Sequence, residues 1–226
     1  VAVTEKTPKW ENVPYVKVSS ARLALAQIGA NYFHRPAESF QLIGVTGTNG
    51  KTSVTLLLRH VLETTLGARV GLIGTTGNLI GDTLIETERT TPESFELQAL
   101  FAQMRDAGCT HVVMEVSSHA IALDRVGGIT FDVAAFTNLT EDHLDFHKTM
   151  DAYCDAKAEL FRRCDKAVVN TDDHYAQRIL AAAGCDVLTT SVVGKGDLTA
   201  GNLELLAEGI VRYQKEVMKI KPIETK

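Results

Sequence analysis

The sequence predicts an α/β fold built on a doubly wound, mostly parallel sheet. Apolar strand-like runs alternate along the chain with helical patterns, which is the order of a parallel sheet with crossover helices. Each strand-like run is followed by polar or charged residues, as in "TGTNGKT", "EVSSHA" and "TNLTEDHLDFH". Because the carboxyl ends of parallel strands share one edge, where ligands bind, we expect a single active site along that edge.

The expected elements run in order from a short N-terminal part into the sheet. A strand in residues 14–20, a helix over 21–33 and a linker at 34–36 come first, as the remnant of a smaller N-terminal domain. Strands are then expected at 41–46, 68–74, 110–116, 131–137, 166–170 and 185–190. Helices are expected near 52–66, 93–107, 150–163 and 173–183. No closing element is evident after Leu198.

Local signals support these elements. The third to fifth strands are near-continuous apolar runs, which is typical of strands covered on both faces. Thr91 is expected to cap the helix near 93–107, with Pro92 at its first position, and Asp172 to cap the helix near 173–183. Residues 75–88 indicate a hairpin inserted after the second strand, with a Gly-Asp turn at 81–82.

Composition restricts the class of protein. The 226 residues are 45% hydrophobic and 23% charged, as in an ordinary soluble globular protein. The net charge of -5 gives no reason to expect a nucleic-acid partner, and no apolar run approaches the roughly 20 residues of a membrane helix. The four cysteines form no C-x-x-C pair, and the first residues lack a signal-peptide layout. We expect a cytoplasmic protein with free thiols and no membrane insertion.

The stretch "GVTGTNGKTS", residues 44–53, predicts a phosphate-binding loop between a strand and a helix. Its glycines stand at 44, 47 and 50, whereas the common P-loop pattern would place a glycine at Val45. Backbone N–H groups and the following helix N-terminus can cradle phosphates. Lys51 would reach the terminal phosphates, and the Thr52 hydroxyl would contact Mg²⁺.

Other candidate residues follow the later strands. Glu115 ends a buried strand, where either a metal ion or a salt bridge would offset the cost of burying its carboxylate. Ser117 and Ser118 could be functional or could cap a helix. His143 lies in a segment rich in Asp and His, which suits one Mg²⁺ contact better than a zinc site. Lys157 on its own has the pattern of a solvated surface charge.

Taken together, these segments resemble the Mur ligases. The resemblance covers residues 15–209 and rests on "GVTGTNGKTS", "RTTPES", "VVMEVSSHAIALDRV", "FDVAAFTNLTEDHLDFHKTM" and "DAKAELF". The glycine spacing of the loop is the family's own form. Members of the family use ATP to phosphorylate a substrate carboxylate, and an amine then displaces phosphate to form an amide. The branch most similar to this sequence adds a diamino acid to UDP-N-acetylmuramoyl-L-alanyl-D-glutamate, the UDP-N-acetylmuramoyl-dipeptide.

The resemblance assigns roles by matching position. Catalytic roles fall on Lys51, Glu115, His143 and Lys157. Metal ligation falls on Thr52, Glu115, His143 and Lys157, the last of them as a carbamate. The muramoyl-dipeptide would contact Thr90, Thr91, Ser117 and Arg125. ATP would contact the loop residues Gly47, Thr48, Asn49, Gly50, Lys51, Thr52 and Ser53.

The resemblance also implies a domain division and leaves alternatives. Residues 1–40 would end the UDP-binding domain, residues 41–226 would form an incomplete ATP-binding domain, and a C-terminal ligase domain would be absent.

Two residues on the substrate side depart from the pattern of relatives. Arg89 stands where relatives often have Asn, and Leu123 stands where some have Gln. The sequence does not distinguish meso-diaminopimelate from L-lysine. A folylpolyglutamate-synthetase-like ligase and a non-catalytic nucleotide-binding fragment are the competing interpretations.

Overall fold

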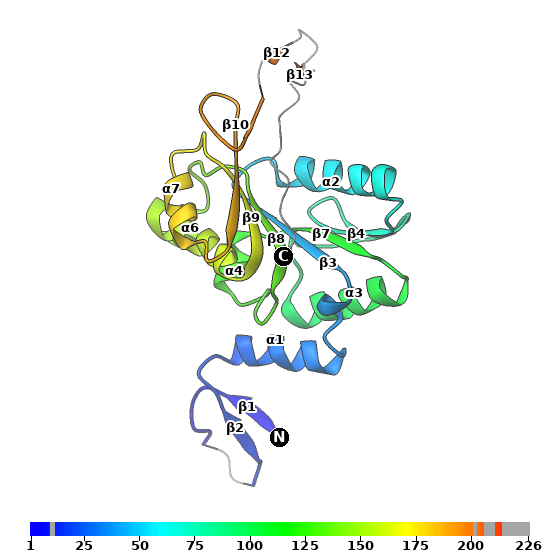
Figure 1. The fold of residues 1–226 in the computed structure, drawn as a ribbon. Coiled ribbons are helices and arrows are strands. Elements are labelled where there is room, and N and C mark those ends of the chain that lie inside the picture. The colour runs from blue at the N-terminus through cyan, green and yellow to red at the C-terminus, as the bar shows by residue number, and fades with distance from the viewer. Residues whose placement is uncertain (10–11, 201–202, 206–210, 214–226) are drawn as a thin grey trace.

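The computed structural model describes residues 1–9, 12–200, 203–205 and 211–213 (Figure 1). Its strands are β1 (Ala2–Thr4), β2 (Tyr15–Lys17), β3 (Gln41–Thr46), β4 (Val70–Ile73), β5 (Asn78–Ile80), β6 (Thr83–Ile85), β7 (His111–Glu115), β8 (Phe131–Phe136), β9 (Cys164–Asn170), β10 (Asp186–Ser191), β11 (Leu198–Thr199), β12 (Leu203–Leu205) and β13 (Val211–Tyr213). Its α-helices are α1 (Ala21–Tyr32), α2 (Lys51–Leu66), α3 (Ser94–Asp106), α4 (Ser118–Ala122), α5 (Leu144–His147), α6 (Met150–Ala158) and α7 (Ala176–Ala182). Two 3₁₀ helices are η1 (Pro36–Ser39) and η2 (Glu159–Arg162).

One main sheet organises the described residues. Its strand order is β11-β10-β9-β8-β3-β7-β4-β5-β6. All neighbours from β11 to β4 pair in parallel, and the β5–β6 hairpin joins β4 in the antiparallel sense. β3 lies between β7 and β8, so the chain leaves β3 for one side of the sheet and later returns to the other. The doubly wound, mostly parallel sheet predicted from the sequence is therefore confirmed, and its switch point lies beside β3.

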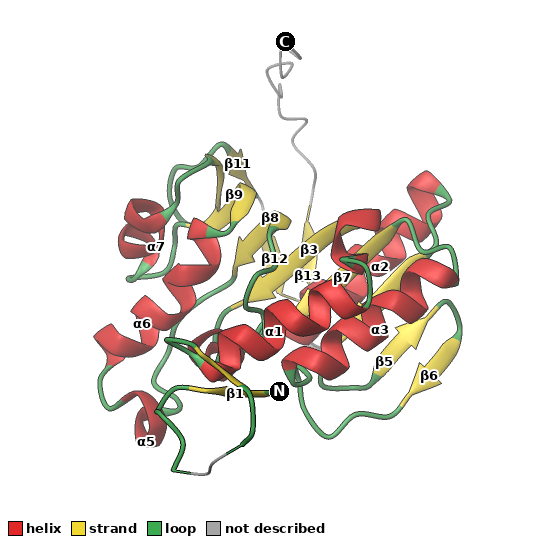
Figure 2. Ribbon diagram, turned by 90° about the horizontal axis from the view of Figure 1, so that it is seen from below, coloured by secondary structure: helices red, strands yellow, loops and turns green. Residues whose placement is uncertain are grey.

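Helices cover both faces of this sheet. α2 packs against β3, β4 and β7, and Figure 1 shows α3 on the other side of the same strands. α1 lies beside α3, as Figure 2 shows from below. The apolar core between these layers includes aromatic and aliphatic side chains that are almost fully buried: Phe101, Phe131, Phe161, Met104, Met114 and Leu42.

The predicted caps of two helices are wrong. α3 begins at Ser94 with Glu93 as its N-cap, in a reciprocal capping box with Glu96, rather than with Thr91 and Pro92. α7 begins at Ala176. Asp172 instead accepts a hydrogen bond from the Val192 backbone N–H at 2.6 Å, after the neighbouring strand. Thr91 Oγ1 likewise donates to Glu115 O at 2.9 Å. Both side chains that local rules assign to helix caps therefore form hydrogen bonds with distant residues instead.

Other differences from the predicted elements are smaller. The helix expected near 150–163 divides into α6 and η2, and the expected hairpin at 75–88 forms with its turn at residues 81–82. β11, which begins at Leu198, adds a strand to the main sheet, and after it β12 and β13 pair with each other. Among the described residues, no helix is both long and apolar enough to span a bilayer. The proposed division at residue 40 stays a prediction.

Candidate active site

The glycine-rich loop lies at the carboxyl end of β3, where the expected phosphate site should be. Gly47 has a φ of +147°, and a Cβ there would lie 1.9 Å from the Thr137 Oγ1. Gly50 is the N-cap of α2 with a φ of 83°. Glycine is therefore needed at 47 both for the backbone conformation and for the close approach of the loop after β8.

The loop is held by the segment that follows β8. Asn138 accepts a hydrogen bond from Thr48 N at 2.8 Å through its carbonyl oxygen, and from Asn49 N at 3.0 Å through its side chain. Its own side-chain amide donates to Asn49 O at 3.1 Å. The Asn49 side chain donates to Thr140 Oγ1 at 3.2 Å. These bonds fix the loop shape before any ligand arrives, which lowers the cost of ordering it.

Lys51 lies in the first turn of α2 and folds back over the loop. Its Nζ donates to Gly47 O at 2.9 Å and to Thr48 O at 2.8 Å. Burial lowers the pKa of Lys51, while the negative charges of Glu115 and Asp142 oppose that fall. The ammonium group therefore lies at the loop carbonyls, within reach of a phosphate that the loop would hold.

Glu115 ends β7 and is 1% exposed. Its carboxylate accepts hydrogen bonds from Thr52 Oγ1 at 3.0 Å, from Thr75 N at 3.0 Å and from Thr75 Oγ1 at 3.2 Å. Among the described residues it has no salt bridge, so that interpretation of Glu115 is wrong. The structure thus brings Glu115 and Thr52 into direct contact, 63 residues apart in sequence.

Lys157 lies inside the protein, although its sequence pattern alone favours a surface charge. It is 1% exposed, its Nζ donates to Gly47 O at 2.9 Å, and it lies 4.5 Å from the centre of the Tyr153 ring. Burial lowers the pKa of Lys157 to about 7, and the positive charge of Lys51 acts in the same direction. The solvated-surface interpretation is therefore excluded, and a large neutral fraction is expected at neutral pH.

His143 forms no hydrogen bond with the glycine-rich loop in the described structure. Its backbone φ is +53°, its side chain is about half exposed, and its Nε2 is 3.5 Å from Asp142 Oδ2. Its ring centre is 6.0 Å from that of Tyr153, whose hydroxyl lies 3.2 Å from Thr48 Oγ1. No hydrogen bond joins His143 to Glu115 or Thr52 within the described residues. A shared metal site for His143 and Glu115 therefore stays a prediction.

The four residues expected to contact substrate form one network beside Glu115. Thr91 Oγ1 donates to Glu115 O at 2.9 Å and accepts from Ser117 N at 3.1 Å. Ser117 also caps α4 by accepting from Ala120 N. Thr90 Oγ1 lies 3.0 Å from Thr75 Oγ1, so a chain of hydrogen bonds links it to Glu115.

Arg125 completes that network. Its Nη1 donates to Thr91 O at 3.3 Å, and its Nη2 lies 2.8 Å from Glu93 Oε1. Its Nε is buried without a hydrogen-bond partner in the described structure. Glu93 also lies 3.7 Å from Arg22 and 4.0 Å from Arg89. Three guanidinium groups thus lie around the Glu93 carboxylate, and guanidinium groups are well suited to binding carboxylates.

Sequence reasoning missed several residues that shape the site. Thr75, Tyr153, Asn138 and Glu93 received no role, although Thr75 and Asn138 lie in polar segments directly after predicted strands. A position directly after a predicted strand was therefore a signal that could have found Thr75 and Asn138. Tyr153 and Glu93 carried no such signal, because a helical tyrosine and an exposed-looking glutamate are ordinary in any sequence.

Comparison with known proteins identifies relatives of this architecture. Residues 45–224 match the family described as the Mur ligase middle domain. The UDP-N-acetylmuramoyl-L-alanyl-D-glutamate--2,6-diaminopimelate ligase 1 of Clostridium acetobutylicum is 49% identical over 210 residues, which are 92% of this chain and 43% of that protein. The corresponding ligase of Corynebacterium glutamicum is 50% identical over 210 residues, 90% of this chain and 40% of that protein. The chain thus spans less than half the length of these relatives.

Solved structures agree with the fold. A UDP-N-acetylmuramoyl-L-alanyl-D-glutamate--2,6-diaminopimelate ligase matches with a TM-score of 0.79 at 28% identity, covering 93% of this chain and 44% of that one. The folylpolyglutamate synthase of Mycobacterium tuberculosis, complexed with ADP and AMPPCP, matches with a TM-score of 0.69 at 19% identity. The match covers 85% of this chain and 51% of that one. At that identity the second likeness shows the fold alone.

Proposed function

The chain belongs to the Mur ligase family, and from that premise we propose that it carries the ATP-binding core of a ligase. The ligase joins a diamino acid to UDP-N-acetylmuramoyl-L-alanyl-D-glutamate in peptidoglycan precursor synthesis. One observation carries the proposal. The phosphate loop, the Thr52–Glu115 pair, the buried Lys157 and the Arg125 network all lie along the carboxyl edge of one sheet. The 2,6-diaminopimelate in the names of relatives favours that diamino acid over L-lysine.

The proposed reaction has two steps. An oxygen of the D-glutamate side-chain carboxylate bonds to the γ-phosphorus of ATP, the bond from that phosphorus to its bridging oxygen breaks, and ADP leaves. The nitrogen of the amino substrate then bonds to the acyl carbon, phosphate leaves, and the nitrogen loses a proton. The protein mainly positions the reactants and offsets charge, and Lys51 is placed to do so at the phosphates.

Mg²⁺ fits the oxygen donors that the edge offers. Thr52 Oγ1 and a carboxylate oxygen of Glu115 are 3.0 Å apart, and the buried carboxylate has no ion-pair partner among the described residues. These two residues would hold the ion, with His143 proposed as a further contact. When bound, Mg²⁺ supplies positive charge beside the transferred phosphoryl group.

We propose that Lys157 works as a carbamate. Its amine must be neutral to attack CO₂, and burial together with the Lys51 charge brings the pKa of Lys157 to about 7. The nitrogen bonds to the carbon of CO₂ and gives up a proton, which leaves an anion with two oxygen donors. Such an anion suits a hard cation and also removes the repulsion between two ammonium groups at Gly47 O.

The substrate side is proposed from the hydrogen-bond network. The exposed surfaces of Arg22 and Arg89 leave donors for carboxylates of the muramoyl-dipeptide, and Arg125 shares the Glu93 carboxylate with them. The same hydrogen-bond network includes the hydroxyl groups of Thr90, Thr91 and Ser117, and Arg125 joins it through Thr91 O.

Substrate-dependent phosphate release tests the proposal. The chain is incubated with ATP, Mg²⁺, the UDP-muramoyl-dipeptide and 2,6-diaminopimelate, and phosphate and the amide product are measured. We expect phosphate release that requires the muramoyl-dipeptide and is lost in Lys51→Ala but kept in the control Lys166→Ala, whose side chain is exposed. A folyl substrate replaces the muramoyl-dipeptide in a parallel reaction. Release with the folyl substrate instead would overturn the proposed substrate, and nucleotide binding that no acid substrate turns into phosphate release would favour the interpretation of this chain as a non-catalytic nucleotide-binding fragment.

A further inference from the structure

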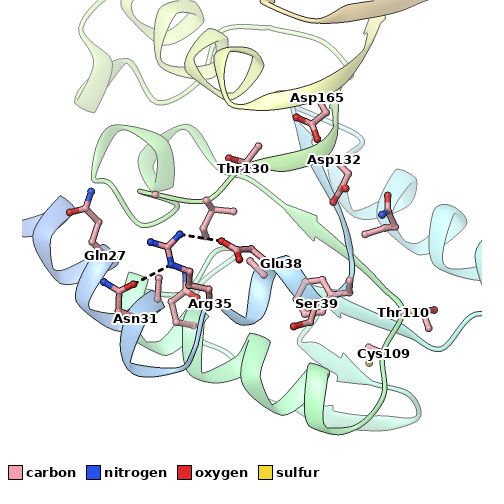
Figure 3. A pocket seen from close by; sticks show the side chains of 17 residues that line it. Gln27, Asn31, Arg35, Glu38, Ser39, Cys109, Thr110, Thr130, Asp132 and Asp165 are labelled. Carbon is pink, nitrogen blue, oxygen red and sulfur yellow. Dashed lines mark hydrogen bonds and ion pairs between the residues drawn. The ribbon is translucent and has the colours of Figure 1, made fainter. Parts of the chain in front are cut away.

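A second site lies at the opposite edge of the main sheet. A cavity of about 850 Å³ opens between α1, η1 and the amino ends of the central strands (Figure 3). Its walls include Gln27 and Asn31 from α1, Gln98 from α3, and Asp132 and Asp165 at the starts of β8 and β9. The phosphate loop follows the carboxyl end of β3, so this cavity is separate from the candidate active site.

Two carboxylates stand side by side in this cavity. β8 and β9 pair in parallel with Phe131 opposite Cys164 and Val133 opposite Lys166, which places Asp132 beside Asp165 on the same face of the sheet. One oxygen of Asp132 accepts from Leu42 N at 2.6 Å, whereas the Asp165 side chain forms no hydrogen bond with the described residues. Neither Asp132 nor Asp165 forms a salt bridge with another residue that the structure describes. Adjacent like charges in a sheet are unfavourable, so a cation between them would relieve a real cost.

A buried amide gives an independent sign of a ligand. Gln98 lines the same cavity, is 2% exposed, and its Oε1 has no hydrogen-bond partner in the described structure. Neither amide atom bonds to another described residue. A buried amide without partners is costly, and native proteins satisfy such groups with water or with a ligand.

The other charges of the cavity are already paired. Arg35 donates to Glu38 at 3.2 Å and to Asn31 at 3.3 Å, as the dashed lines in Figure 3 show. The guanidinium is thus neutralised by Glu38, and the unpaired charge that remains on the walls is negative. A bare metal ion fits poorly, since the described residues hold no group of three metal-binding side chains. The volume instead matches that of small-molecule sites.

We propose that this cavity binds a small organic ammonium compound. Its charged nitrogen lies between Asp132 and Asp165, where an –NH₃⁺ group can donate to both carboxylates. A second polar group of the compound pairs with the amide of Gln98 after a side-chain rotation that turns its buried Oε1 toward the cavity. The proposal depends only on this cavity and is independent of the ligase activity.

Backbone NMR titration tests the site with defined probes. 1,5-Diaminopentane is the ammonium probe, and glutarate, with a five-carbon chain and opposite charge, is its control. We expect saturable shifts from the diamine, with a Kd on the order of 1 mM or lower, confined to residues around the cavity. Glutarate should give none. Raising the salt concentration from about 50 to about 500 mM should raise the Kd of the diamine, because the contact is ionic.

Three variants assign the contacts. Asp165→Asn should raise the Kd at least about threefold, and Asp132→Asn combined with Asp165→Asn more than about tenfold; the carbonyl oxygen introduced by Asp132→Asn can still accept from Leu42 N. Asp186→Asn, on the next strand and outside the cavity lining, is the charge-matched control and should not change the Kd. Gln98→Met keeps the side-chain size; we expect weaker diamine binding without loss of thermal stability.

Three results would overturn the proposal. They are shifts that do not saturate, shifts centred away from the cavity, and an unchanged Kd in the double aspartate variant. Loss of stability in Gln98→Met together with unchanged diamine binding would show that the amide is satisfied by water as part of the fold. Each outcome is read on the whole chain and needs no enzymatic assay.

Discussion

Lys157 should make the folded protein less stable at neutral pH than a chain with an uncharged side chain at the same position. The pKa of Lys157 falls from an ordinary 10.5 to about 7, chiefly because of burial. At ~1.4 kcal/mol for each pH unit of that difference, the folded state bears a cost of about 5 kcal/mol, as an upper limit. Lys157→Met removes the titrating group and keeps an unbranched side chain. Gly47 O keeps a donor, because Lys51 bonds to it at 2.9 Å.

The sign of the pH dependence follows from linkage. Between pH 7 and pH 10.5 the unfolded chain holds a proton on Lys157 that the folded chain does not, so stability of the parent rises with pH across this window. The cost is complete below about pH 7 and vanishes above the unfolded value. After allowing for lost contacts with Gly47 and Tyr153, we expect Lys157→Met to gain about 2–4 kcal/mol at about pH 6 and progressively less toward about pH 9.5.

Urea unfolding from about pH 6 to about pH 9.5, in buffers free of CO₂, measures this difference. Lys166→Met is the control, because it removes an exposed lysine of β9 and should change stability little at any pH. A constant difference between Lys157→Met and the parent across the range would refute a lowered pKa. A loss of stability at the acidic end would show that the hydrogen bond and ring contact outweigh the burial of the amine.

Three further substitutions test the candidate active site. Lys51→Ala should weaken binding of ADP by about 10- to 150-fold in calorimetry with the fold intact, since a charge-assisted phosphate contact is worth about 1.5–3 kcal/mol; unchanged affinity would contradict its role. Gly47→Ala should abolish nucleotide binding and lower the melting temperature, because its Cβ would lie 1.9 Å from Thr137 Oγ1; a parent-like titration would mean that the loop can move aside. Glu93→Gln should keep the α3 cap but free Arg125, so the muramoyl-dipeptide should bind with altered affinity while ADP binds as before; a change in both would point to a structural effect instead.

Residues whose role depends on the chain immediately around them could be predicted from the sequence. The phosphate loop needs only a strand, spaced glycines and a helix start, and Gly47, Gly50 and Lys51 take up that arrangement. The sheet order could be predicted only as a class, because alternation fixes parallel pairing but not which strand lies beside β3. The hairpin at 75–88 was predictable because its turn is local.

Residues whose role depends on distant partners could not be predicted in this way. Thr91 satisfies the usual rule for a helix cap, yet Glu115 O and Ser117 N, 24 and 26 residues away, take its hydroxyl. Lys157 lies on the same face of its helix as Tyr153, Cys154 and Ala158, but nothing local shows its partner, which is Gly47 O, 110 residues earlier. Only the resemblance to a family singled it out from the sequence.

A partly buried lysine, Lys51, and a buried one, Lys157, meet at one backbone carbonyl of the loop. Lys51 and Lys157 both donate to Gly47 O at 2.9 Å, so two cationic groups would share a single acceptor. Like charges this close disfavour one another, and the more buried amine is the one that gives up its proton more readily. Lys157 is 1% exposed, and its pKa falls to about 7, so above that pH it is mainly neutral, whereas we propose that Lys51 keeps its charge for phosphate. We propose that the two lysines at Gly47 O thereby take different roles, Lys51 as a cation and Lys157 as a nucleophilic amine.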